Sequence, residues 1–169
     1  GELAKDSTSD ETIKQYLDHG ACETRATWID GSTAPGNGET WLKEVRLRPP
    51  PGVDPMEVTV SQELQIDVAY ANTISDAMLH VSLVLYRSEN ICVFNSASNP
   101  SRKHADLFLE SCEIPGGLLN DETYRVRVLL IKNHTQAICD EKDVITFRVQ
   151  DTTSQGAWHG KWLGAVRPN

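Results

Sequence analysis

The stretch Leu79-His80-Val81-Ser82-Leu83-Val84-Leu85-Tyr86 decides the fold of this chain. Its odd-numbered positions are all Leu or Val, whereas its even-numbered positions include His80, Ser82 and Tyr86. Successive side chains of a β-strand point to opposite faces, so this alternation predicts a strand that buries one face and exposes the other.

The same period of two returns along most of the chain, in short runs separated by polar turns. No helical pattern of ten or more residues separates the runs, which argues against a parallel sheet with crossover helices. We therefore predict an all-β antiparallel sandwich of about eight or nine strands. The expected runs are residues 41–48, 56–60, 64–70, 79–86, 91–94, 104–114, 124–131, 137–140 and 145–149.

The N-terminal part has a different pattern. Ile13, Tyr16 and Leu17 form one apolar stripe, so residues 8–18 are expected to form a short helix. Residues 31–38, Gly-Ser-Thr-Ala-Pro-Gly-Asn-Gly, are rich in residues that favour turns, and residues 20–40 are expected to be a linker. We place a domain boundary near residue 38, with the sandwich over residues 39–169.

Charge and cysteine content narrow the classes of partner. A formal net charge of -8 disfavours nucleic acid and anionic membranes, which attract clustered Lys and Arg. No apolar run approaches the ~20 residues that span a bilayer. Cys22, Cys92, Cys112 and Cys139 form no CxxC pair and are expected to be buried free thiols, although disulfides in a secreted protein remain open.

Signals of catalysis are missing from the sequence. It contains no phosphate-binding GxxxxGK[ST] loop, no GxGxxG and no GxSxG. The five histidines are far apart and form no HxH or HExxH pair, so no metal site is expected. We predict a non-catalytic protein without a cofactor.

The exposed face of the sheet is the best candidate for a binding site. Sugars are bound by flat aromatic rings and by planar polar side chains at concave, mostly preformed sites. Residues 94–104 form a polar segment that would rim such a face, and Arg87, Arg102 and Arg127 would suit an anionic ligand. Against this, Leu129 and Ile131 make the face apolar enough to be covered by another segment or subunit. The candidate sugar-binding residues are His80, Ser82, Tyr86, Asn95, Arg102, His104 and Arg127.

Two terminal segments carry a resemblance to a known family. One is Gly1-Glu2-Leu3-Ala4-Lys5-Asp6 followed by Thr12-Ile13-Lys14-Gln15-Tyr16-Leu17. The other, more specific, is Gly156-Ala157-Trp158-His159-Gly160-Lys161-Trp162-Leu163-Gly164-Ala165-Val166-Arg167-Pro168. With the strand order between them, the chain resembles the C-terminal domain of the ATP-binding subunit of O-antigen polysaccharide ABC exporters, the Wzt type.

This resemblance implies an immunoglobulin-like β-sandwich that binds the non-reducing end of a finished O-polysaccharide. Residues 1–38 would be the tail of a preceding nucleotide-binding domain and a linker. The full-length subunit would be an ATPase that contacts the transporter's membrane subunit, in the cytoplasm at the inner face of the inner membrane. The resemblance also implies a homodimer, with residues 152–169 as the segment exchanged between subunits. Burial against a partner would suit the apolar side chains of that tail, Trp158, Trp162, Leu163 and Val166.

Alternatives remain open at the level of sequence. The tail could pack on its own sandwich instead of a partner's. The chain could be a secreted immunoglobulin-like carbohydrate-binding or adhesion module, which predicts disulfides. It could also be a dimerisation domain without a ligand, whose outer sheet face is covered by the partner.

Overall fold

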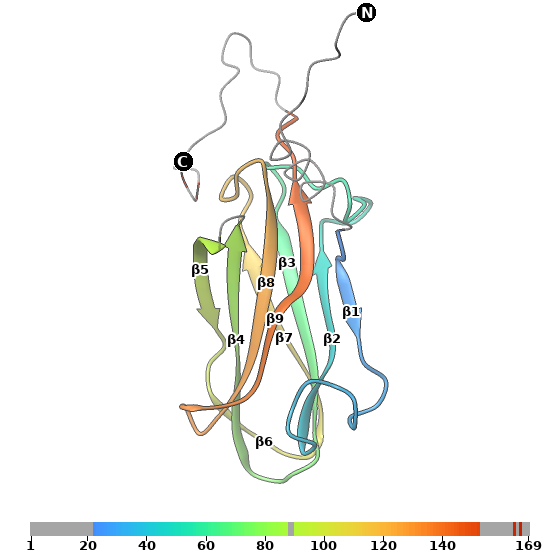
Figure 1. The fold of residues 1–169 in the computed structure, drawn as a ribbon, viewed down its shortest axis with the longest axis vertical. Coiled ribbons are helices and arrows are strands. Elements are labelled where there is room, and N and C mark those ends of the chain that lie inside the picture. The colour runs from blue at the N-terminus through green and yellow to red at the C-terminus, as the bar shows by residue number, and fades with distance from the viewer. Residues whose placement is uncertain (1–21, 88–89, 153–163, 165, 167–169) are drawn as a thin grey trace, which may run out of the picture.

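The computed structural model describes residues 22–87 and 90–152, together with residues 164 and 166. Strands dominate these residues (Figure 1). The helix expected over residues 8–18 lies outside the described residues and stays a prediction. The strands are β1 (Arg25–Thr27), β2 (Thr40–Arg48), β3 (Leu64–Asn72), β4 (Ala77–Arg87), β5 (Cys92–Ala97), β6 (Ser101–Lys103), β7 (Asp106–Ile114), β8 (Glu122–Lys132) and β9 (Gln136–Val149).

The strands form two antiparallel sheets that face each other. One sheet has four strands in the order β1-β2-β3-β7. The other has five, in the order β5-β4-β8-β9 with β6 also paired to β4. The predicted antiparallel sandwich is therefore confirmed. β4 and β8 are each paired on both sides and are therefore the interior strands of the five-stranded sheet.

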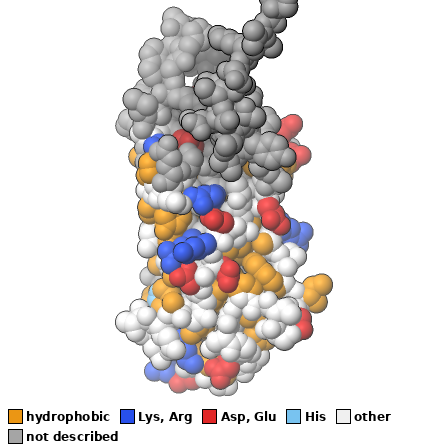
Figure 2. Space-filling view, viewed as in Figure 1, with side chains coloured by type: hydrophobic (Ala, Val, Ile, Leu, Met, Phe, Trp, Pro, Cys, Tyr) orange, Lys and Arg blue, Asp and Glu red, His pale blue; other side chains and the backbone are white. Residues whose placement is uncertain are grey.

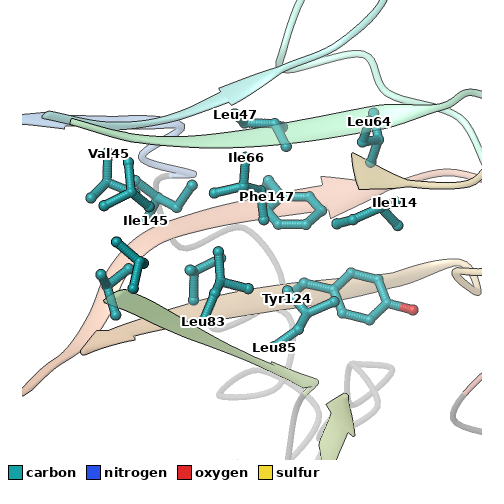
Figure 3. Packing of buried hydrophobic residues seen from close by; sticks show 14 of the residues in the cluster. Val45, Leu47, Leu64, Ile66, Leu83, Leu85, Ile114, Tyr124, Ile145 and Phe147 are labelled. Carbon is teal, nitrogen blue, oxygen red and sulfur yellow. The ribbon is translucent and has the colours of Figure 1, made fainter. Parts of the chain in front are cut away.

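The core fills the space between the sheets with the alternate residues that the period of two predicted. Figure 3 shows Leu83, Leu85 and Tyr124 pointing towards side chains of the opposite layer, among them Ile66 and Leu47. These five side chains are at most 4% exposed. Burying a side chain of this size contributes about 1.5–3 kcal/mol relative to leaving it in water.

A buried tyrosine fixes the chain where it crosses from the four-stranded to the five-stranded sheet. The Tyr124 hydroxyl accepts a hydrogen bond from the backbone N–H of Asn120 at 2.9 Å and donates one to its carbonyl at 3.2 Å. The ring stacks on Phe147 with centroids 5.6 Å apart. Burial raises the pKa of Tyr124 to about 12, so the hydroxyl remains a donor throughout the physiological range. This arrangement, a tyrosine corner, is typical of immunoglobulin-like sandwiches.

Both ends of the described sandwich lie at the same end of the molecule (Figure 1). The carbonyl of Glu23, just before β1, accepts a hydrogen bond from Thr146 of β9 at 2.9 Å. Beyond β9, Gln150 exchanges backbone hydrogen bonds with Val58 and Val60, at 2.9 and 3.0 Å. The expected strand over residues 56–60 is thus a loop whose two buried valines attach it to the end of β9.

Three segments differ from their predictions. The expected linker of residues 20–40 contains β1, which pairs with β2 although it is only three residues long. Residues 94–104, expected to be a polar loop, instead hold most of β5 and all of β6, because both strands pair with the edge of β4. The separate runs over residues 137–140 and 145–149 are one strand, β9, interrupted by a bulge opposite β8.

The cysteines are free thiols, as predicted, but only Cys139 is buried. Burial raises its pKa to about 12. Cys92 is exposed on the edge strand β5, and Cys22 and Cys112 are half-buried. The prediction of buried thiols was therefore wrong for three of the four: Cys92 and Cys112 lie on the edge strands β5 and β7, and Cys22 precedes the first strand. No helix among the described residues is long and apolar enough to cross a membrane.

Candidate functional site

The outer face of the five-stranded sheet, hereafter the outer face, consists of the side chains that alternate with the core on β4, β5, β8 and β9. Residues directly opposite in an antiparallel pair point to the same side, so the register places them in rows. Val84 lies between Asn95 and Arg127. One row along, Ser82 lies between Ala97 and Leu129.

Two arginines from β8 pair with two aspartates from β9 on this face. Arg127 donates from Nε and Nη2 to the two carboxylate oxygens of Asp140, at 2.6 and 2.5 Å. Arg125 donates from Nη1 to both oxygens of Asp143 at 3.0 and 3.1 Å, and from Nη2 to Asn90 at 2.6 Å. Figure 2 shows such basic and acidic side chains next to each other.

The bulge in β9 explains how these aspartates reach β8. Regular pairing stops at Val126↔Ile145 and resumes at Val128↔Glu141, so the β9 side has extra residues. Asp143 takes a left-handed backbone conformation there, with φ 53°. Bulges redirect side chains in this way and are frequent at functional sites. The bulge thus brings Asp143 onto Arg125.

Arg127 and Asp140 stabilise each other's charged form. A hydrogen bond from Arg127 lowers the pKa of Asp140 below the usual range of a carboxyl. Hydrogen bonds to Asp140 and then to Tyr86 raise the pKa of Arg127. Arg127 thus connects Tyr86 to Asp140, and these hydrogen bonds hold its guanidinium group in place. A held guanidinium loses little further side-chain entropy when it binds a ligand.

The structure brings five of the seven candidate sugar-binding residues onto the middle of the outer face. Tyr86, Asn95 and Arg127 remain accessible there, with Asn95 exposed and the other two half-buried. Ser82 donates its hydroxyl to the Oδ1 atom of Asn95 at 3.0 Å and so orients that amide. Whether these residues bind a sugar stays a prediction.

The expected exposure of β4 was wrong. His80, Ser82 and Val84 are at most 8% exposed, because neighbours on both sides cover the short side chains of a central strand. The Nδ1 atom of His80 has no hydrogen-bond partner within the described part of the chain. Burial lowers the pKa of His80, with a further effect of nearby His134, so its ring is neutral at pH 7. A direct contact of His80 or Ser82 with a ligand would require these neighbours to move.

Two candidates lie away from that centre. Arg102 is opposite Met78 on the same face, but six residues along β4 from Val84, which is roughly 20 Å at ~3.3 Å per residue. It pairs with Asp76 at 2.6 Å. His104 lies in the connection to β7, where it contacts Asp106 at 3.3 Å and the edge of the Phe108 ring. The expected site is therefore split into a central group and two outlying residues.

Two other features lie outside this face. A groove of about 860 Å³ lies at one end of the four-stranded sheet and is lined by residues 48–51, 63–65 and 113–115. On the outer side of that sheet, Leu107 and Leu109 of β7 are 60% and 58% exposed. Among the described residues, no group of three or more His, Cys, Asp or Glu is arranged to hold a metal ion.

Most of the C-terminal tail is outside the described residues, and so are Trp158, Trp162 and Leu163. Val166 is described and is 40% exposed. The carbonyl of Gly164 accepts hydrogen bonds from Arg87 at 3.3 Å and from the side-chain amide of Asn120. The exchange of the tail between subunits stays a prediction.

Comparison with solved structures matches the whole sandwich. The crystal structure of the C-terminal domain of Wzt aligns with 98% of this chain and 95% of its own, with a TM-score of 0.62 and 14% sequence identity. The chain has the fold of the Wzt C-terminal domain. The resemblance to the Wzt type that the terminal segments indicated is thereby confirmed in structure.

Other matches are partial. A β-D-mannosidase from Dictyoglomus thermophilum aligns with 66% of this chain and 13% of its own, at 10% identity and a TM-score of 0.44. A β-glucuronidase from Bacteroides uniformis aligns with 72% of this chain and 14% of its own, at 12% identity and a TM-score of 0.44. No protein-family model and no curated protein matches the sequence.

The sequence did not indicate Asp140 and Asp143, the two aspartates on β9 of this Wzt-like sandwich that pair with Arg127 and Arg125. Asp140 ends what looked like a separate short run, and Asp143 falls where the alternation breaks. The interrupted alternation of apolar and polar residues was the available signal. A bulge within one strand shifts this alternation, so in the sequence the strand looks like two separate runs. Asn90, just before β5, has a positive φ of 58°, which the sequence alone did not indicate.

Proposed function

We propose that this chain recognises the non-reducing end of a bacterial O-antigen polysaccharide, without catalysing a reaction, and thereby selects glycans for export by an ABC transporter. One observation carries the proposal. The outer face carries the aromatic ring of Tyr86 next to the Arg127–Asp140 pair, and the exposed amide of Asn95 lies across Val84 from Arg127. This is the mixture of flat apolar and planar polar groups that sugar recognition requires.

The roles of the individual residues follow from their contacts. Tyr86 offers a ring to the C–H side of a sugar, and Leu129 adds apolar surface beside Asp140. Asn95 offers its amide N–H groups, because its Oδ1 atom accepts the hydroxyl of Ser82. A site with few such groups binds modestly, with a Kd of ~10⁻⁶ to 10⁻³ M, or roughly 4 to 8 kcal/mol.

The cellular setting of the chain is part of the same proposal. It is supported by the structural likeness to the C-terminal domain of Wzt, which covers 98% of this chain. Residues 1–38 are the tail of a nucleotide-binding domain and a linker. The chain works as a homodimer in the cytoplasm, at the inner face of the inner membrane, where the full-length subunit contacts the transporter's membrane subunit. Residues 152–169 are exchanged between the two copies. Two linked copies raise the effective concentration of a site that binds weakly alone.

Calorimetric titration with O-polysaccharide fragments tests the binding function. We expect Tyr86→Ala and Asn95→Ala each to weaken binding about fivefold to a hundredfold, the usual range for a central contact residue. The control is Leu107→Ala, which removes an exposed apolar side chain from the opposite sheet and should leave the affinity unchanged. Equal loss in all three variants, or no binding by the unaltered chain, would contradict the proposal.

A dimerisation domain without a ligand is the second candidate function. The exposed Leu107 and Leu109 favour it, since such side chains cluster where proteins associate. This alternative predicts that the glycan titration is flat and that Leu107→Ser with Leu109→Ser lowers the oligomeric state.

A further inference from the structure

We infer that the outer face takes an uncharged sugar terminus and discriminates against phosphate-bearing or acidic ones. This inference rests on the proposed function, because it specifies the class of glycan that the same face binds. It departs from the interpretation that the arginines of this region would suit an anionic cap.

The first step is that each arginine near the face already has a carboxylate partner. Arg127 pairs with Asp140 at 2.5 Å, and Arg125 pairs with Asp143 at 3.0 Å. At one end of β4, Arg102 pairs with Asp76 at 2.6 Å, and on β9 Arg148 pairs with Asp121. The four positive and four negative charges cancel, so the face has no net charge from these pairs.

The second step concerns what an anion would have to displace. Both Nε and Nη2 of Arg127 donate to Asp140, which is the geometry that a phosphate or carboxylate would itself need. An anionic ligand would therefore compete with a tethered carboxylate. The displaced Asp140 would remain nearby and repel the ligand, because like charges at close range oppose each other's ionised form. The formal net charge of -8 on the whole chain adds to that repulsion at longer range.

The third step is that a neutral sugar meets no such competition. A hydroxyl group is both a donor and an acceptor, so it can donate to the outward lone pairs of Asp140 and leave the ion pair intact. Asp140 stays an ionised acceptor because the hydrogen bond from Arg127 keeps its pKa low. The amide of Asn95 and the ring of Tyr86 are uncharged as well. Tyr86, Asn95 and the Arg127–Asp140 pair are thus suited to hydroxyls and C–H surfaces.

Two probes separate the classes of ligand. The first is an array of immobilised bacterial O-polysaccharides grouped by their non-reducing end as neutral, phosphate-bearing or uronate-bearing. We expect binding to the neutral group, with less than about a twofold change in affinity between 50 and 300 mM NaCl, since little screened attraction is involved. The second is inorganic phosphate, which should leave the Nε–H NMR signals of Arg125 and Arg127 unmoved at ~10 mM.

A matched pair of variants tests the cause. Asp140→Asn removes the competing charge and exposes Arg127, so binding of phosphate-bearing glycans should rise about tenfold relative to neutral ones. Asp76→Asn makes the same change beside Arg102, roughly 20 Å along the sheet, and should not alter the preference. Asn also tolerates the left-handed conformation of residue 76, with φ 63°. Circular dichroism confirms that each variant is folded.

The outcomes are distinct. A preference for phosphate-bearing or uronate-bearing ends, or a phosphate shift at Arg127 in the unaltered chain, overturns this inference and leaves the proposed function standing. An unchanged preference in Asp140→Asn overturns it too. No binding to any class of glycan overturns the proposed function, and the inference with it.

Discussion

At the scale of single residues, the four-stranded sheet holds a buried carboxylate, Asp67, whose two oxygens are both hydrogen-bonded. Asp67 points away from the core on β3, yet its side chain is only 2% exposed. It accepts hydrogen bonds from Arg46, Arg48, Gln65 and Ser111. Leaving such a carboxylate with fewer partners is costly, so the cluster ties together three strands of the four-stranded sheet.

The pH dependence of stability follows from Asp67. Burial alone would raise its pKa, but hydrogen bonds from Ser111, Arg46 and Gln65 outweigh burial and lower it. A carboxyl whose folded pKa is lowered contributes stability above its unfolded pKa of about 3.9, and that contribution is lost as the pH falls through the folded value. We expect the free energy of unfolding in urea to drop between pH 5 and 3, and to drop less in Asp67→Asn. Equal drops in both chains would show that other carboxyls are responsible.

Removing the Tyr124 hydroxyl tests the tyrosine corner. We expect Tyr124→Phe to lower the free energy of unfolding by about 1–2 kcal/mol, because two backbone groups of Asn120 lose their partner. Tyr86→Phe is the matched control on the outer face and should change stability by less than about 0.5 kcal/mol. Urea unfolding at pH 7 measures both, and a neutral Tyr124→Phe would contradict the structural role.

At the scale of elements, the alternation of apolar and polar residues predicted most strands, but it did not predict the bulge that interrupts β9. The run over residues 79–86 became β4 because its odd positions face the core. Pairing partners are non-local. The three residues of β1, of which only Ala26 is apolar, gain a partner only when β2 is in place, so local sequence could not indicate this strand. The same limit applies to the site. The sequence indicated Tyr86, Asn95 and Arg127 by face, but the burial of His80 depends on neighbouring strands that no local pattern specifies.

The hairpin between β8 and β9 offers a stabilising change. Asn133 and His134 have positive φ angles of 53° and 67°. Asn tolerates this conformation, whereas His is less suited to it than Gly. We expect His134→Gly to raise the melting temperature, corresponding to about 0.5–1 kcal/mol, without changing glycan affinity. Gly117→Ala, at φ 81°, is the opposite control and should destabilise. A destabilised His134→Gly variant would contradict the strain argument.

At the scale of the whole molecule, the two sheets present different outer surfaces. One presents compensated charges and the other the exposed Leu107 and Leu109. We predict that light scattering finds a dimer for the full chain and a monomer for a chain that ends at residue 152. If the shortened chain remains a dimer but Leu107→Ser with Leu109→Ser does not, the four-stranded sheet is the interface and the exchange of the tail is wrong.

The placement of Glu23 and Gln150 at one end of the sandwich has a consequence for how the unit can be used in larger proteins. A compact unit whose chain enters and leaves at neighbouring points can be grafted between two host segments without stretching either of them. The hairpins at the far end, and the long sides of both sheets, stay clear of such a host. Transplanting residues 22–152 into a surface loop of an unrelated carrier should therefore preserve the fold and leave both outer surfaces accessible.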